Sequence, residues 1–152
     1  MNTSLITAQQ HKMNTVQVPN QGASDDRICH HTMLIFVVDD HEMMRDAMVG
    51  VLRRTEKTAK VRELKCFEEF LDAVDIHGAP DLLVLNLTLP RILGYEGVRH
   101  ARALCPKMRL AVYSASPALD REQQCIASGA DIYIEKTNSS GAFYNAIKKL
   151  LN

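Results

Sequence analysis

Short apolar runs alternate with amphipathic stretches along most of this chain. Residues 33–38 form a continuous apolar, largely β-branched run, which is typical of a strand buried on both faces. The next stretch, 41–54, has apolar residues at helical spacing, and its arginines, Arg45 among them, are predicted on the opposite, outward side. The same reasoning predicts strands at 33–38, 61–64, 81–85, 109–113 and 131–135. It predicts helices at 41–54, 68–76, 95–104, 119–128 and 139–151.

Strands that alternate with helices predict a parallel sheet with helices on both faces. Because crossovers between parallel strands are right-handed, few topologies remain. For five strands the best known of these is the doubly wound, flavodoxin-like order 2-1-3-4-5. We therefore predict an α/β fold of the (βα)5 type, with a five-stranded parallel sheet in that order.

The first 32 residues differ in composition from the rest of the chain. They are rich in Gln, Asn, Thr and Ser, and they contain few large apolar residues and no sustained periodicity. Such a segment buries too little apolar surface to offset the entropy lost on ordering. We expect a flexible N-terminal extension at 1–32 and one domain at 33–152.

Charge and composition narrow the class of protein. The chain has 152 residues with 18 basic and 18 acidic side chains, so its formal net charge is zero. This balance argues against direct contact with nucleic acid, which a basic excess would favour. No apolar run approaches the roughly 18 residues that span a bilayer, and the N-terminus lacks the features of a secretory signal. The 4 cysteines show no zinc-ligand spacing, so we expect a cytoplasmic protein without membrane contact.

Polar residues follow the predicted strands at their carboxyl ends. Asp39 and Asp40 follow the first strand, and Asn86, Ser114 and Lys136 follow the third, fourth and fifth. In a doubly wound sheet these ends meet at the edge where ligands bind. Two adjacent carboxylates at a buried strand end are costly unless a cation such as Mg²⁺ or a lysine neutralises them. A helix cap would explain one of the two acids but not the whole set.

The set of motifs resembles the receiver domain of bacterial response regulators, the CheY-like fold, over about residues 34–151. An Asp-Asp-His start and a threonine instead of proline after Lys136 are most similar to receivers of LuxR-type (NarL/FixJ-like) regulators. The segments that carry the resemblance are 37–41, 86–94, 113–115 and 129–136.

The resemblance implies a magnesium site and a set of switch residues. Asp40 would bind Mg²⁺ directly, Asp39 would bind it through water, and Thr88 would supply its backbone carbonyl. In this family the aspartate that ends the third strand accepts the phosphoryl group from a histidine kinase, with Mg²⁺ neutralising the charge that develops.

The same resemblance assigns the residues around the phosphoryl group. Ser114 would hydrogen-bond to it and Lys136 would pair with it. Tyr133 would report the state of the site to the surface through its rotamer.

The acceptor position itself holds Asn86. A carboxamide is a poor nucleophile and forms no acyl phosphate as a carboxylate does. With one negative charge fewer, the site should also bind Mg²⁺ more weakly. Three accounts stay open: a natural pseudo-receiver, an ordinary receiver whose Asp was replaced by Asn, and slow deamidation of Asn86 to Asp. No residue is predicted to be catalytic.

The expected partners are a sensor histidine kinase or another regulator protein. A homodimer would use the helices at 41–54 and 139–151, or the surface made by 119–128, 131–135 and 139–151. The chain would be a single-domain regulator or the receiver piece of a longer transcription factor.

Two other classes of function compete with the receiver. A Mg²⁺-dependent phosphohydrolase needs a nucleophilic aspartate with an acid two residues later, whereas Asp39 and Asp40 are adjacent. A flavodoxin needs a Ser/Thr/Gly-rich phosphate loop after the first strand, and this chain has Asp39-Asp40-His41 there. Both rank below the receiver.

Overall fold

A computed structural model of the chain describes residues 31–115, 119–136 and 139–152. The predicted flexible extension at 1–32 therefore lies outside the described residues, except for its last two. Among the helices of the described part, none is long and apolar enough to cross a membrane.

Five parallel strands form one sheet in the order β2-β1-β3-β4-β5, so the predicted topology is confirmed. The observed elements differ from the predicted ranges by at most one residue at either end. The strands are β1 Leu34–Val38, β2 Lys60–Leu64, β3 Leu82–Asn86, β4 Arg109–Ser114 and β5 Ile132–Glu135. The helices are α1 Glu42–Thr55, α2 Phe67–His77, α3 Gly94–Leu104, α4 Leu119–Ala127 and α5 Ser140–Leu151.

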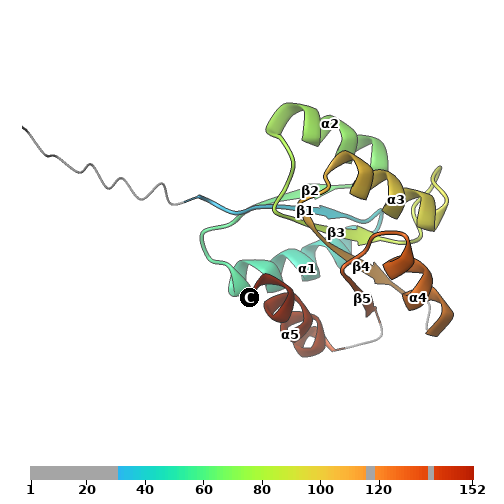
Figure 1. Ribbon diagram of the computed structural model, residues 1–152. Coiled ribbons are helices and arrows are strands. Elements are labelled where there is room, and N and C mark those ends of the chain that lie inside the picture. Colours follow the sequence, from blue (N-terminus) through green and yellow to red (C-terminus); the bar gives the residue numbers. More distant parts are fainter. Residues whose placement is uncertain (1–30, 116–118, 137–138) are drawn as a thin grey trace, which may run out of the picture. The chain divides into compact units, whose positions relative to one another are not determined.

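The helices cover the sheet on both faces, with α1 and α5 on one side and α2, α3 and α4 on the other (Figure 1). Each face has its own apolar core. Phe36 and Val38 of β1 point into the core below α2 and α3, while Ile35 and Val37 point into the core below α1 and α5. All four side chains are fully buried. This two-sided burial is why the central strands have continuous apolar sequences instead of alternating ones.

Arg45 corrects one expectation, because it lies on the inner side of α1 and not on the outer one. Its side chain is buried at 5% exposure, and its Nη1 donates a hydrogen bond to the backbone oxygen of Asp39 at 2.8 Å. Arg45 precedes Met48 and Val49 by three and four positions, so it shares their face of the helix. Both of these residues are buried, and a cation on that face is tolerated because the Asp39 carbonyl accepts a hydrogen bond from it.

At the amino ends of the strands, Arg102 joins α3 to the segments that precede β4 and β5. Its Nε donates to the carbonyl of Gly129 at 2.8 Å, its Nη1 to that of Met108 at 2.6 Å, and its Nη2 to the Asp131 carboxylate at 2.8 Å. Gly129 has φ +113, and a Cβ placed there would lie 2.8 Å from the Arg102 Cγ. Only glycine meets both the backbone and the space requirement at this turn.

Candidate functional site

The predicted edge brings together side chains from three strands. Asp39 and Asp40 follow β1, Asn86 is the last residue of β3, and Lys136 follows β5. They adjoin a hollow of about 530 Å³. The residues that line it are Asp40, His41, Asn86, Thr88, Leu89, Pro90, Ala115 and Lys136.

Asp39 and Lys136 form the strongest charge pair of this edge. The Lys136 Nζ lies 2.6 Å from Asp39 Oδ2, the carboxylate is fully buried, and the lysine side chain is only 11% exposed. A buried carboxylate is costly without such a partner, and removal of either one leaves an uncompensated charge. Lys136 was predicted to supply the positive charge that compensates the acids, and it contacts Asp39 directly.

The Asn86 side chain points its amide nitrogen at both acids. Nδ2 lies 3.3 Å from Asp39 Oδ1, 3.1 Å from Asp40 Oδ1 and 3.0 Å from the Thr88 carbonyl oxygen. The other end of the amide, Oδ1, accepts a hydrogen bond from the Thr88 backbone N–H at 3.2 Å. The opposite orientation would set Oδ1 against two carboxylates and a carbonyl, all acceptors. The network therefore fixes Asn86 as a donor to the acidic pair.

This arrangement bears on whether the site suits Mg²⁺. Carboxylate and backbone carbonyl oxygens are the ligands this ion prefers, so Asp40 and the Thr88 carbonyl are of the right chemical type. An N–H donor of the protein already lies at the point on which those oxygens converge. A cation therefore competes with the Asn86 amide. Binding would require the amide to turn and give up its bond with the Thr88 N–H.

His41 belongs to the site, although it was not among the polar residues predicted to gather at the strand ends. Its ring Nδ1 lies 3.2 Å from an oxygen of Asp39 and 3.2 Å from an oxygen of Asp40, and its backbone N–H donates to Asp39 at 2.9 Å. Among the described residues, Asp39, Asp40 and His41 form a group whose ligand atoms all lie within 4.8 Å of one another. Its position directly after the acids was the available sequence signal.

Ser114 and Tyr133 are not among the residues that line this hollow. Ser114 is the last residue of β4 and is fully buried. Burial raises the pKa of the Tyr133 hydroxyl, and a side-chain hydrogen bond with Ser114 opposes that rise. Two of the predicted switch residues are therefore in contact.

The sheet is doubly wound, and it has two acids, a lysine and an amide at the carboxyl ends of its strands. These features place the chain in a class of α/β proteins with a charged pocket at the strand ends. Within that class, residues 35–148 match the family model of the response regulator receiver domain. The chain belongs to this family, as the sequence predicted. Receiver domains are signalling modules of two-component systems, with an acidic pocket that binds Mg²⁺ and with histidine kinases and other regulators as partners.

Curated relatives include transcription regulators. The transcriptional activator protein ExaE of Pseudomonas putida is 29% identical over 119 residues, which cover 78% of this chain and 55% of that protein. The response regulator protein VraR of Staphylococcus saprophyticus is 25% identical over 118 residues, which cover 78% of this chain and 56% of that protein. The chain thus spans about half the length of the curated relatives it matches.

Solved structures agree with the fold. A two-component response regulator of the LuxR family from Aurantimonas sp. SI85-9A1 has a TM-score of 0.71 and 27% identity, over 79% of this chain and 85% of that chain. A CheY-like receiver domain protein from Methanospirillum hungatei JF-1 has a TM-score of 0.68 and 24% identity, over 78% of this chain and 94% of that chain. The second likeness concerns the fold alone.

Proposed function

We propose that this chain is a receiver that takes no phosphoryl group by the usual route and signals through protein contacts. The observation that carries the proposal is the Asn86 amide, which donates toward Asp39, Asp40 and the Thr88 carbonyl. A phosphoacceptor must present a nucleophilic carboxylate oxygen to the hollow. The residue in that position of the sequence presents a neutral N–H group instead.

The remaining acids do not replace the missing nucleophile. Asp39 is fully buried and bound to Lys136, so its oxygens are shielded from a phosphoryl donor. Asp40 lines the hollow, but it is the residue assigned by resemblance to direct contact with Mg²⁺. With Asn86 as a competitor for the same oxygens, Mg²⁺ would bind weakly. The switch residues Ser114, Tyr133 and Lys136 would then respond to a partner and not to phosphorylation.

For the whole protein, the relatives favour a transcription regulator of the LuxR type in which this chain is the regulatory part. Its partners would be a sensor histidine kinase or another regulator in the cytoplasm. A homodimer would form through α1 and α5, or through the surface of α4, β5 and α5. A second reading takes the chain as an otherwise conventional receiver in which Asn replaces the acceptor Asp.

Phosphorylation of the intact chain tests both readings. The chain and its Asn86→Asp variant are incubated with acetyl phosphate and Mg²⁺, and their intact masses are compared. We expect no phosphoryl adduct on the unchanged chain. A phosphoryl adduct on it, mapped to any residue of the hollow, would contradict the proposal.

The variant separates the two readings. If Asn86→Asp acquires one phosphoryl group on residue 86, the remaining machinery is that of a conventional receiver, which favours the second reading. If the variant folds and stays unmodified, the site has lost more than its nucleophile, which favours a natural pseudo-receiver.

A further inference from the structure

Strand β2 is one of the two outer strands of the sheet, and one row of its backbone groups faces away from the neighbouring strand β1. The Lys60 N–H donates to the Met33 carbonyl at 2.8 Å, and the Leu64 carbonyl accepts from the Asp39 N–H at 3.1 Å, so both residues bond toward β1. In a parallel ladder the bonding side alternates along the strand. The N–H and C=O groups of Val61 and Glu63 therefore point away from β1, and no strand within the described residues pairs with them.

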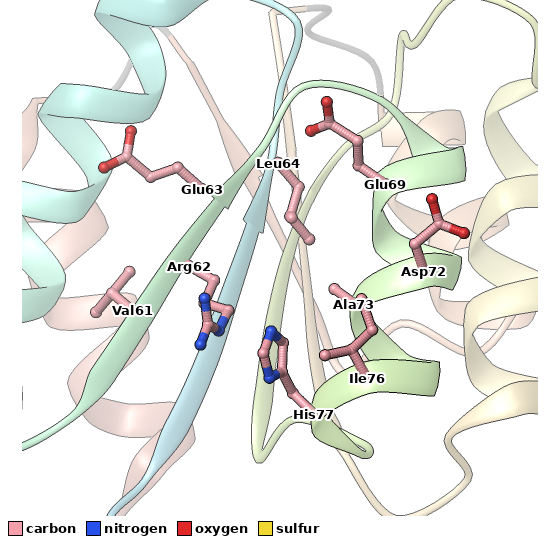
Figure 2. A pocket seen from close by; sticks show the side chains of 9 residues that line it. All are labelled: Val61, Arg62, Glu63, Leu64, Glu69, Asp72, Ala73, Ile76 and His77. Carbon is pink, nitrogen blue, oxygen red and sulfur yellow. The ribbon is translucent and has the colours of Figure 1, made fainter.

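A groove of about 370 Å³ runs between this edge and helix α2 (Figure 2). Its apolar part is made by Leu64 of β2 with Ala73 and Ile76 of α2. Leu64 and Ala73 are buried, whereas Ile76 is 73% exposed, which is high for a large aliphatic side chain. A strand added to the edge would lay alternate side chains into this groove and cover Ile76.

The charges along the groove differ between its ends. Glu69 and Asp72 lie on α2 toward the carboxyl end of β2, Arg62 is the middle residue of β2, and His77 lies toward the amino end (Figure 2). Glu69 already accepts a hydrogen bond from the Lys65 N–H at 2.6 Å, whereas Asp72 is exposed. In a segment bound in this groove, a basic side chain would therefore be complementary to Asp72, and an aliphatic side chain would be complementary to Ile76.

A second copy of this chain is a poor occupant of the edge. If two copies of β2 were joined in one antiparallel sheet by a two-fold axis, residues opposite each other would point to the same face of the sheet. The axis must then be centred on a residue, and that residue lies opposite its own copy. Centring the axis on Arg62 sets Arg62 opposite itself, and centring it on Glu63 sets Glu63 opposite itself. Centring it on Val61 sets Lys60 opposite Arg62. Each of these three registers places like charges opposite each other, which destabilises a strand pair.

We propose that the β2 edge and the α2 groove bind an extended segment of another protein, added to the sheet as a sixth strand. The segment carries a lysine or arginine directed at Asp72 and, two residues away, an aliphatic side chain on Ile76. Its backbone bonds with the outward groups of Val61 and Glu63. This groove shares no lining residue with the acidic hollow, and the proposal is independent of whether that site takes phosphate.

A synthetic peptide tests the proposal by NMR titration and amide hydrogen exchange of the full chain. The probe is a capped heptapeptide with lysine at its centre, valine two residues to either side and threonine elsewhere, which reads the same in both directions. We expect the exchange of the Val61 and Glu63 amides to slow severalfold on binding. The Arg62 and Leu64 amides, which already bond to β1, should stay unchanged.

Matched changes separate strand addition from nonspecific attraction. Replacing the central lysine of the peptide by glutamate, or Asp72→Lys in the protein, should weaken binding about three- to tenfold, because either change turns an attraction between exposed charges into a repulsion. Asp75→Lys makes the same charge change on α2 outside the groove and should leave binding unchanged. Equal effects of Asp72→Lys and Asp75→Lys, protection absent from Val61 and Glu63, or dimerisation through this edge would each overturn the proposal.

Discussion

Replacement of Asn86 by aspartate should make the stability of this domain depend on divalent cations. The change removes an N–H donor that lies within 3.3 Å of Asp39 Oδ1, Asp40 Oδ1 and the Thr88 carbonyl, and it sets a third negative charge at the same point. Hydrogen bonds to charged groups contribute about 1.5–3 kcal/mol each. Partial exposure of Asp40 relieves part of the repulsion. We therefore expect the variant to lose about 2–4 kcal/mol of unfolding free energy without a divalent cation.

Thermal unfolding with and without Mg²⁺ measures this effect. For a domain of this size the loss corresponds to a fall in Tm of roughly 6–15 °C. Mg²⁺ at a hundred times its Kd should return about 2.7 kcal/mol to the variant, while the unchanged chain should respond little. Asn86→Ala removes the donor without adding charge, so it should lose stability but regain little with Mg²⁺. An unchanged chain that is stabilised by Mg²⁺ as strongly as the variant would refute the role given to the amide.

Three further changes test other parts of the structure. Lys136→Met leaves the buried Asp39 carboxylate unpaired and should cost about 3–5 kcal/mol in urea unfolding; the double variant with Asp39→Asn should recover much of this, and additive losses would contradict the pairing. Arg102→Ala should cost about 2–4 kcal/mol because it frees several acceptors, whereas Arg99→Ala, which loses one 3.4 Å contact, should cost well under 1 kcal/mol; similar losses in the two would argue against the clamp. Burial raises the pKa of the Cys125 thiol from 9.0 to about 11, so its contribution to stability is present below pH 9 and is lost as the pH rises toward 11. Its alkylation in the folded chain should therefore be far slower than that of the half-buried Cys66, and equal rates would contradict this burial.

The sequence predicted most of the fold because the share of apolar residues in a strand indicates how far that strand is buried. Residues 33–38 are apolar throughout, and the observed strand β1 is buried on both faces. Arg45 shows where the pattern failed. A charged residue on a helix is ordinarily placed outward, and only the carbonyl of Asp39, supplied by the end of another element, makes its inner position favourable.

The sequence likewise predicted some features of the candidate site and not others. That Asp39, Asp40, Asn86 and Lys136 gather at one edge follows from the rule that parallel strands end together. The direction of the Asn86 amide does not follow from any local pattern. It depends on a backbone N–H two residues later and on acids 46 and 47 positions earlier.

By itself, the sequence determined the alternation of five strands with five helices and the polar residues at the strand ends, because strand burial and helix amphipathicity are local properties. The strand order was predicted from general rules of topology, and the family from a resemblance of motifs. The tertiary structure decided which atoms meet at the strand ends. Asp39 and Lys136 lie 97 positions apart and touch at 2.6 Å, and the outward groups of β2 become a free edge only once β1 pairs with the other side. Such contacts depend on distances between elements, which no single stretch of sequence specifies.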